Sequence, residues 1–317
     1  MSAITTSGLT KSFAGRAALS DVTFDVNDAE VYGLIGPNGA GKTTLIRLLC
    51  GLYRPSAGTG TVLGLDIERE RSQIRANVGY MSQGNGLYGD LTVAENLRFY
   101  AAVYGVREEA RLREVTDWLG LDDVAHHLVA DLPTGLRQRT AFAAAVVHRP
   151  RIVVLDEPTS GVDPLARDTM WELVRSVAAQ GVTALVTTHV MAEAQRCDRL
   201  ALLADSRLIA AGTPEELVAG SGLAIVRVDA SPWTEAFARL RSRWPGAALY
   251  GTRVHLPIRQ GDAEERQIRD VLAGLELRSL TWQPPSIEDA FIALVDRAEP
   301  SRPRTRSRGG DRRRPGK

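Results

Sequence analysis

A glycine-rich loop holds the residues whose types and spacing point most directly to chemistry. Its glycines permit positive φ angles, so several backbone N–H groups can converge on one anion. Lys42 would reach the β- and γ-phosphates of a nucleotide, and the Thr43 hydroxyl would ligate Mg²⁺. We therefore expect a phosphate-binding loop made of Gly36, Pro37, Asn38, Gly39, Ala40, Gly41, Lys42, Thr43 and Thr44.

Two adjacent carboxylates form a second chemical centre. Asp156 and Glu157 close the apolar run from Ile152 to Leu155, which is typical of a strand buried on both faces of a parallel sheet. In open α/β sheets, ligands bind at the carboxyl ends of such strands. We expect Asp156 to hold Mg²⁺, directly or through water, and Glu157 to orient or deprotonate a water molecule.

Three further residues are candidates because each lies at the end of an expected strand. His189 follows the apolar strand 182–188, where a γ-phosphate would lie, and we expect a catalytic or sensing role for it. Gln83 ends the expected strand from residue 78 and could contact the metal ion or the attacking water. Phe13 could stack on an adenine ring, and a strand-end aromatic of the core fits its position equally well.

These side chains need a sheet that brings strand ends together, and the hydrophobic periodicity predicts one. The first two strands have polar turns between them and should form an antiparallel layer beside the nucleotide. Two helices between the halves of the core should form an insertion. The expected strands are 4–13, 18–26, 31–35, 78–83, 152–157 and 182–188. The expected helices cover 91–105, 108–119 and 165–180, and two more begin at about residue 42 and within 132–139.

Together these residues resemble the nucleotide-binding domain of ATP-binding cassette (ABC) proteins over about residues 4–220. The loop from Gly36 matches the family's phosphate loop, Gln83 its Q-loop, Asp156 and Glu157 its Walker B aspartate and catalytic glutamate, residues 160–163 its D-loop, and His189 its switch histidine. The resemblance implies an α/β fold, with a P-loop NTPase core, an antiparallel β layer and a helical insertion. It also implies that the chain binds ATP and Mg²⁺ and hydrolyses ATP, with Phe13 as the adenine-stacking aromatic.

One segment departs from the family's pattern. Residues 132–136 read Leu-Pro-Thr-Gly-Leu, where the family usually has Leu-Ser-Gly-Gly-Gln. In the family's dimer this segment of one subunit binds the γ-phosphate held by the other. Pro133 has neither a hydroxyl nor an N–H to donate, whereas Gly135 and its neighbours still offer N–H groups at a helix N-terminus. We expect a slower or partner-dependent ATPase that still functions.

In this family two subunits share each ATP site and a separate protein forms the transport path, so the resemblance also implies partners. A single cassette cannot complete a site, so the resemblance implies a second ABC cassette, in a homodimer or in a pair with another protein. It implies in addition a separately encoded, polytopic membrane permease, which ATP-driven dimerisation of the cassettes would power. The helical insertion at 91–119 is where we expect that permease to dock.

The pattern changes after the expected cassette, residues 1–220. Residues 223–298 alternate short strands and helices and predict a small α+β accessory domain, in which we expect Trp233, Trp244 and Trp282 to be core residues. The segment from Pro285 to Phe291 resembles the accessory domain of exporter ATPases of the daunorubicin/doxorubicin-resistance type, which implies drug or multidrug export. Residues 299–317 contain few apolar residues and predict a basic disordered tail, in which residues 301–317 carry a net charge of about +7.

Composition limits the classes of protein. The chain has 317 residues, of which 44% are hydrophobic and 24% charged, as in an ordinary globular protein. No run of eighteen apolar residues predicts a membrane span, and no secretion signal is recognisable at the N-terminus. We expect a cytoplasmic protein that is peripheral on the cytoplasmic face of the cell membrane.

Two other functions remain open from the sequence. The first is a soluble, non-transport ABC ATPase, and the second is an importer ATPase whose accessory domain is regulatory. The basic tail could meet anionic lipid or nucleic acid, or have no dedicated partner. Nucleic acid is the partner that we expect least. Against the soluble alternative, translation-type members usually carry two cassettes with a charged linker and repair-type members carry long coiled coils, and neither feature is present here.

Overall fold

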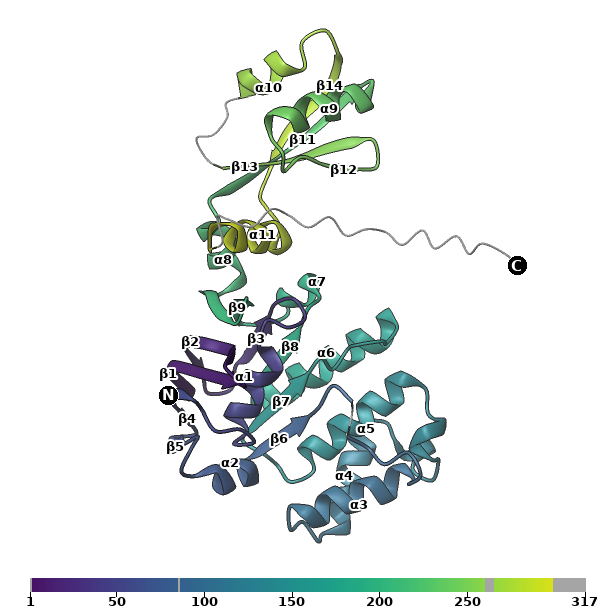
Figure 1. Ribbon diagram of the computed structural model, residues 1–317. Coiled ribbons are helices and arrows are strands. Elements are labelled where there is room, and N and C mark those ends of the chain that lie inside the picture. Colours follow the sequence, from purple (N-terminus) through teal and green to yellow (C-terminus); the bar gives the residue numbers. More distant parts are fainter. Residues whose placement is uncertain (1, 85, 260–264, 299–317) are drawn as a thin grey trace, which may run out of the picture.

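The computed structural model describes residues 2–84, 86–259 and 265–298. Figure 1 shows a lower body that contains two sheets, an upper sheet with its own helices, and the helices α8 and α11 between them. The expected basic tail, 299–317, lies outside the described residues. No helix in the described part of the chain has the length and apolar character that a membrane span requires.

A six-stranded sheet forms the centre of the lower body, in the order β10-β9-β3-β8-β7-β6. Its strands are parallel apart from β10, which pairs antiparallel with β9. Every residue of β3, β7 and β8 is buried, as expected for parallel strands that are covered on both faces. The bounds are β3 Val31–Ile35, β6 Val78–Met81, β7 Ile152–Asp156, β8 Thr183–Thr188, β9 Arg199–Ala204 and β10 Arg207–Gly212.

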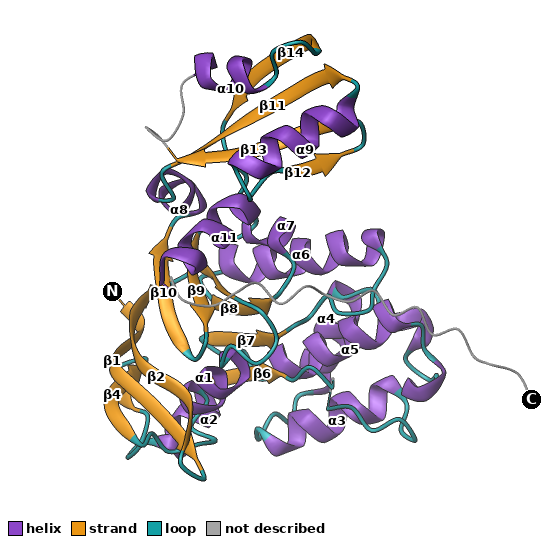
Figure 2. Ribbon diagram, turned by 45° about the horizontal axis from the view of Figure 1, so that its top comes forward, coloured by secondary structure: helices purple, strands orange, loops and turns teal. Residues whose placement is uncertain are grey.

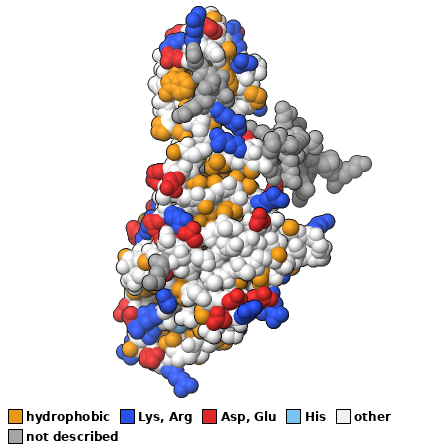
Figure 3. Space-filling model, turned by 90° about the vertical axis from the view of Figure 1, so that its left-hand side faces the viewer, with side chains coloured by type: hydrophobic (Ala, Val, Ile, Leu, Met, Phe, Trp, Pro, Cys, Tyr) orange, Lys and Arg blue, Asp and Glu red, His pale blue; other side chains and the backbone are white. Residues whose placement is uncertain are grey.

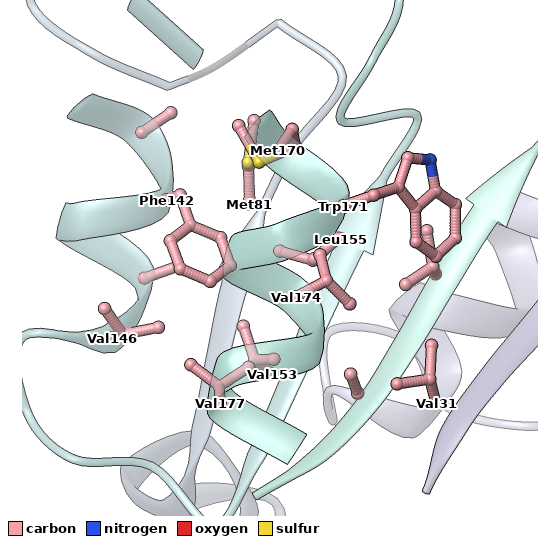
Figure 4. Close-up of a cluster of buried hydrophobic side chains, with 14 of the residues drawn as sticks. Val31, Met81, Phe142, Val146, Val153, Leu155, Met170, Trp171, Val174 and Val177 are labelled. Carbon is pink, nitrogen blue, oxygen red and sulfur yellow. The ribbon is translucent and has the colours of Figure 1, made fainter. Parts of the chain in front are cut away.

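Helices α5 (Thr134–Val146) and α6 (Pro164–Ala179) pack on this sheet. Figure 4 shows Phe142 of α5 and Trp171 of α6 in one apolar cluster with strand residues such as Leu155. The side chain of Asp163 accepts a hydrogen bond from the backbone N–H of Ala166, and a proline follows it, so α6 begins with a favourable cap.

An antiparallel sheet, in the order β2-β1-β4-β5, lies beside the central one. Helix α1 (Lys42–Leu49) lies between the two sheets, and its residues Leu45 and Leu48 are completely buried in a cluster to which both sheets contribute. The predicted combination of a P-loop core with an antiparallel layer is therefore confirmed. The strands are β1 Ser2–Phe13, β2 Arg16–Asn27, β4 Ala57–Val62 and β5 Leu65–Asp66.

The expected helical insertion lies between β6 and β7. Its first helix begins with a capping box, in which Thr92 and Glu95 satisfy each other's backbone N–H groups. Val115 and Leu97 bury their side chains in the cluster that contains α5. The insertion consists of α3 (Val93–Val103), α4 (Glu109–Trp118) and the 3₁₀ turns Asp122–Val124 and Val129–Asp131, and the short α2 (Arg71–Asn77) precedes β6.

The upper sheet has the antiparallel order β12-β13-β11-β14. With its helices it follows the βαββαβ sequence of a ferredoxin-like arrangement. The prediction of three core tryptophans is wrong for two of them, because Trp233 is 39% and Trp282 45% exposed, whereas Trp244 is partly buried. The elements are β11 Leu223–Ser231, α9 Trp233–Arg243, β12 Ala248–Tyr250, β13 Arg253–Arg259, α10 Glu265–Val271 and β14 Glu276–Gln283.

Helix α11 (Ile287–Ala298) lies between the upper sheet and the lower body, as Figures 1 and 2 both show. Ile287 belongs to the main apolar cluster of the lower body, and Phe291 and Leu294 pack against that cluster. Arg297 donates hydrogen bonds to the carbonyls of Gly220 and Ser221, at 3.0 and 2.6 Å. The last described helix is therefore part of the packing of α7 (Met191–Ala194) and α8 (Pro214–Gly220).

The surface carries charges of both signs. On the face that Figure 3 presents, Lys and Arg side chains are interspersed with Asp and Glu, and hydrophobic side chains gather at mid-height and on the upper part.

Candidate functional site

The glycine-rich loop joins β3 to α1, as expected, and its tight packing explains two of its glycines. A Cβ at Gly36 would lie 2.1 Å from the carbonyl oxygen of Leu203. A Cβ at Gly41 would lie 2.7 Å from the carbonyl oxygen of Ala18, and the φ of +104° there also disfavours other residues. Leu203 belongs to β9 and Ala18 to β2, so the central sheet and the antiparallel layer hold the loop from two sides.

The Lys42 ammonium group lies inside this loop. It donates hydrogen bonds to the carbonyl oxygens of Gly36 at 2.8 Å and Pro37 at 3.2 Å, and it lies 3.8 Å from a carboxylate oxygen of Glu157. Burial lowers the pKa of Lys42, and the nearby carboxylates of Glu157 and Asp156 oppose that shift. A desolvated cation within reach of the loop is suited to an anionic ligand.

Asp156 is held between Thr43 and a threonine of the neighbouring strand. The Thr43 hydroxyl donates to Asp156 Oδ2 at 3.1 Å, and the Thr187 hydroxyl donates to Oδ1 at 2.7 Å. Asp156 and Thr187 are cross-strand partners in the parallel register of β7 and β8. This buried arrangement places a carboxylate and a hydroxyl oxygen side by side, which are ligand types that Mg²⁺ prefers.

Glu157 is the point where the predicted catalytic residues meet. Its carboxylate accepts a hydrogen bond from Gln83 Nε2 at 3.0 Å, and the other oxygen lies 3.3 Å from His189 Nδ1. Its backbone N–H donates to the hydroxyl and the carbonyl of Thr187, at 2.9 and 3.2 Å. Glu157 has a φ of +53°, a left-handed conformation that costs about 1 kcal/mol for a residue with a Cβ. That conformation turns the side chain out of the strand toward Lys42.

Two predicted site residues lie apart from this group. The Phe13 ring is 43% exposed and makes an edge-on contact with Tyr53, with 5.3 Å between ring centroids. Gly135 lies in the first turn of α5, where a Cβ would come within 2.9 Å of the Cβ of Ala166. Among the described residues, no hydrogen bond or ion pair connects either of them to Glu157.

The sequence did not indicate Thr187, although it makes more contacts with the acid pair than any predicted residue. The sequence does show a polar residue, Thr187, at the carboxyl end of an apolar strand. It does not show that this residue contacts Asp156, because that contact depends on the register of two strands that are distant in sequence. The same holds for a second buried group, in which Thr159 donates to Glu193 at 2.7 Å and Arg167 lies 3.4 Å from the same oxygen.

The chain matches the family model described as "ABC transporter" over residues 19–160. It is 35% identical to the Nod factor export ATP-binding protein I of Rhizobium leguminosarum bv. viciae, over 93% of this chain and 95% of that protein. It is 46% identical to the probable multidrug ABC transporter ATP-binding protein YbhF of Escherichia coli (strain K12), over 67% of this chain. That match spans only 37% of the length of YbhF.

Solved structures agree with the sequence relatives. A structure of an ATP-binding subunit of an ABC transporter superposes with a TM-score of 0.63 at 31% identity, over 69% of this chain and 93% of that one. A dimeric ATP-binding cassette in a post-hydrolysis state, bound to ADP and Pi, shares the fold, with a TM-score of 0.61 at 24% identity over 66% of this chain and 98% of that one. The chain belongs to the family of ABC transporter ATP-binding proteins, which hydrolyse ATP.

Proposed function

We propose that this chain is the ATP-hydrolysing subunit of an exporter and that it powers a separately encoded membrane permease. The observation that carries the proposal is the convergence of Lys42, Gln83 and His189 on the carboxylate of Glu157, within 3.8 Å. A carboxylate in this position can accept a proton from water while the ammonium group and the loop N–H groups bind phosphates.

The contacts support a separate role for each side chain. Glu157 accepts the proton of the attacking water, and the left-handed backbone fixes its direction. His189 lies at the exposed side of Glu157, with a side chain that is 45% exposed, so it can reach the γ-phosphate of a bound nucleotide. Gln83 connects Glu157 to the start of the helical insertion, so a movement of the insertion would displace the catalytic acid.

The oxygen ligands of Thr43 and Asp156 fit a Mg²⁺ ion. Their side chains already lie within 3.1 Å of each other, and Thr187 fixes the second oxygen of Asp156. Gln83 donates its amide N–H to Glu157, and its amide oxygen is the atom that would join the ion. Mg²⁺ would neutralise charge that develops on the phosphates during transfer.

A second cassette would complete each site. The exposed phosphate loop and the N-terminus of α5 at Gly135 belong to the same chain but lie apart, so one copy would present α5 to the nucleotide of the other. Pro133 is the N-cap of α5 and supplies no side-chain hydrogen bond. The N–H groups of Thr134, Gly135 and Leu136 follow it, and a helix N-terminus attracts anions. A homodimer is the simplest form, and a solved dimeric cassette of the same fold supports it.

The insertion supplies a surface for the permease. Tyr88, Phe99 and Val103 are 46%, 40% and 63% exposed, although each is a large apolar side chain. Val103 also lines a cavity of about 430 Å³, together with residues that include Leu52 and Tyr80. Exposed apolar residues next to a hollow are typical of a protein-binding surface.

The relatives that bear export names support export over import, and they also support a location at the cytoplasmic face of the membrane. We propose further that residues 1–220 act as the catalytic unit and residues 223–298 as an accessory unit. A soluble, non-transport ABC ATPase remains the alternative.

Glu157→Gln tests the catalytic part. The amide cannot accept the proton of water, so we expect the variant to bind ATP while its turnover falls at least about a hundredfold. Glu172→Gln, on the exposed side of α6, makes the same chemical change away from the site and should leave turnover unchanged. Undiminished hydrolysis by Glu157→Gln would contradict the role of this carboxylate.

Copurification tests the transport part. Tagged protein from solubilised membranes of the native host should bring down a polytopic membrane protein in stoichiometric amount. Phe99→Glu, on the insertion, should release that protein without changing ATP binding. Ribosomal or repair proteins in place of a membrane protein would overturn the exporter proposal and favour the soluble alternative.

A further inference from the structure

Glu193, on the short helix α7, is a buried acid that the proposed catalytic steps do not use. It is 1% exposed, although a glutamate is rarely buried unless a partner offsets its charge. Helix α7 begins two residues after His189, and Figure 2 shows it next to α6. Glu193 therefore lies close in sequence to the histidine that contacts Glu157.

Thr159 makes the shortest contact with the Glu193 carboxylate. Its hydroxyl is also buried and donates a hydrogen bond to Glu193 Oε1 at 2.7 Å. Arg167 of α6 lies 3.4 Å from the same oxygen, but Arg167 Nε makes no hydrogen bond with the described residues. A hydrogen bond depends on direction as well as distance. Thr159 therefore fixes the orientation of Glu193, and Arg167 offsets its charge.

The position of His189 depends on the turn that joins β8 to α7. The histidine side chain is 45% exposed, and among the described residues it is joined by an ion pair or hydrogen bond only to Glu157. Within the turn, the backbone N–H of Val190 donates to the hydroxyl of Thr188 at 3.0 Å. The backbone N–H of Glu193 donates to the carbonyl of Val190, also at 3.0 Å. A contact that holds Glu193 therefore also holds the backbone of this turn.

The two loops that follow β7 and β8 contact each other at two points. Thr159 follows Glu157 by two residues, and Glu193 follows His189 by four. One contact joins His189 Nδ1 to Glu157 Oε1 at 3.3 Å, and the other joins Thr159 to Glu193 at 2.7 Å. Two contacts restrict both the separation and the relative rotation of two short segments, whereas one contact restricts only the separation. The buried contact thus limits how far the histidine can move from the proposed catalytic acid.

Two other ion pairs connect α6 with the segment after α7, and both are exposed. Asp168 pairs with Arg196, and Arg175 pairs with Asp198 at 2.7 Å. These side chains are 40–54% exposed, and exposed pairs contribute little to stability. Neither pair contacts the loop after Glu157. They therefore provide a comparison, because they join the same two parts of the chain without the buried contact.

We propose that Glu193 is a positioning residue for ATP hydrolysis, which holds His189 against Glu157 through its hydrogen bond with Thr159. The proposal rests on the roles proposed above for the histidine and for Glu157. Among the described residues, no hydrogen bond or ion pair joins Lys42 to Thr159 or Glu193, since the lysine contacts the phosphate loop and Glu157. Loss of the buried hydrogen bond should therefore lower turnover and leave nucleotide affinity unchanged.

Two substitutions of Thr159 separate the hydrogen bond from packing. Valine keeps the shape and loses the hydroxyl, whereas serine keeps the hydroxyl and loses a methyl group. With the full chain, we expect Thr159→Val to lower kcat about tenfold, while the Kd for a fluorescent ATP analogue changes less than about twofold. Thr159→Ser should keep at least about half of kcat, because its hydroxyl can still donate to Glu193. Asp168→Asn, which removes the exposed pair with Arg196, is the matched control and should change neither quantity.

A double variant tests whether Thr159 acts through Glu193. Glu193→Met has a similar length and no oxygen to accept the hydrogen bond, so it should lower kcat as Thr159→Val does. If the two residues act as a pair, the double variant should be no slower than the slower single variant, because the bond is already lost. Effects that multiply would show that the residues act independently and would overturn the proposal. The comparison of valine with serine decides the question even if Glu193→Met does not fold.

Three further results would also overturn the positioning role. They are an undiminished kcat in Thr159→Val, a lower kcat in Thr159→Ser than in Thr159→Val, and a loss of nucleotide affinity as large as the loss of kcat. Glu157→Gln separates this proposal from the proposed function. If Glu157→Gln stops turnover and Thr159→Val does not lower it, only the positioning role fails. If Glu157→Gln hydrolyses ATP normally, the proposed catalytic function itself is wrong.

Discussion

Thr187 offers the sharpest test of how the acid pair is held, through the substitution Thr187→Val. Valine has nearly the same shape, so the change removes a hydroxyl and creates no cavity. The lost hydrogen bond to Asp156 is charge-assisted and contributes about 1.5–3 kcal/mol. The lost hydrogen bond from the backbone N–H of Glu157 contributes less, because that N–H also donates to the carbonyl oxygen of residue 187, which valine retains. We expect the free energy of unfolding to fall by about 2–4 kcal/mol.

The measurement is urea unfolding, together with steady-state ATP hydrolysis. Turnover should fall at least about tenfold, since the Asp156 carboxylate would no longer align with Thr43 and the backbone N–H of Glu157 would lose one of its two acceptors. Thr140→Val is the matched control, because Thr140 is also completely buried but donates only to the helix carbonyl of Leu136. A Thr187→Val variant that unfolds within about 0.5 kcal/mol of the control and keeps wild-type turnover would refute the reasoning.

Three further predictions concern the loop, the signature segment and a buried histidine. Lys42→Ala should lose nucleotide affinity itself, as fluorescent-nucleotide titration would show, and unchanged affinity would exclude Lys42 from phosphate binding. Pro133→Ser should raise basal ATP hydrolysis about tenfold if the missing hydroxyl limits closure, and an unchanged rate would mean that the neighbouring N–H groups suffice. Burial lowers the pKa of His148 to about 4, so only the unfolded chain binds a proton there between about pH 6.5 and pH 4. Stability should therefore decrease by about 2 kcal/mol as the pH falls through that window. His148→Phe, which keeps the stack on Tyr104, should lessen the decrease in urea unfolding, and an identical pH dependence would contradict the assignment.

Local patterns predicted the parts of the site that are close together in sequence. The loop from Gly36 to Lys42 joins a buried strand to a helix, and those few residues contain the information for that turn. Asp156 and Glu157 were found in the same way, because an apolar run that ends in two acids identifies the end of a core strand. The roles assigned to these residues and the placement of the domain boundaries remain predictions.

Tertiary arrangement accounts for what the sequence did not predict. Thr187 becomes important only through the register of β8 against β7, which no local pattern contains. Trp233 and Trp282 are exposed, so the prediction that they are core residues is wrong. A large apolar side chain in the sequence does not reveal which face of its strand or helix will be covered.

The packing of α11 also affects the order in which the chain can fold during synthesis. A ribosome makes the lower body first, yet Ile287, Phe291 and Leu294 must still be added to the cluster around Met191. At 5–20 residues per second, the residues between Gly220 and the end of α11 take roughly 4–16 s to make. Throughout that time the apolar patch around Met191, close to His189, stays uncovered on the nascent chain, and a molecular chaperone can bind it. Only a chain translated through α11 can complete its core. Truncated chains would keep the apolar patch exposed, and chaperones and proteases would recognise them by it.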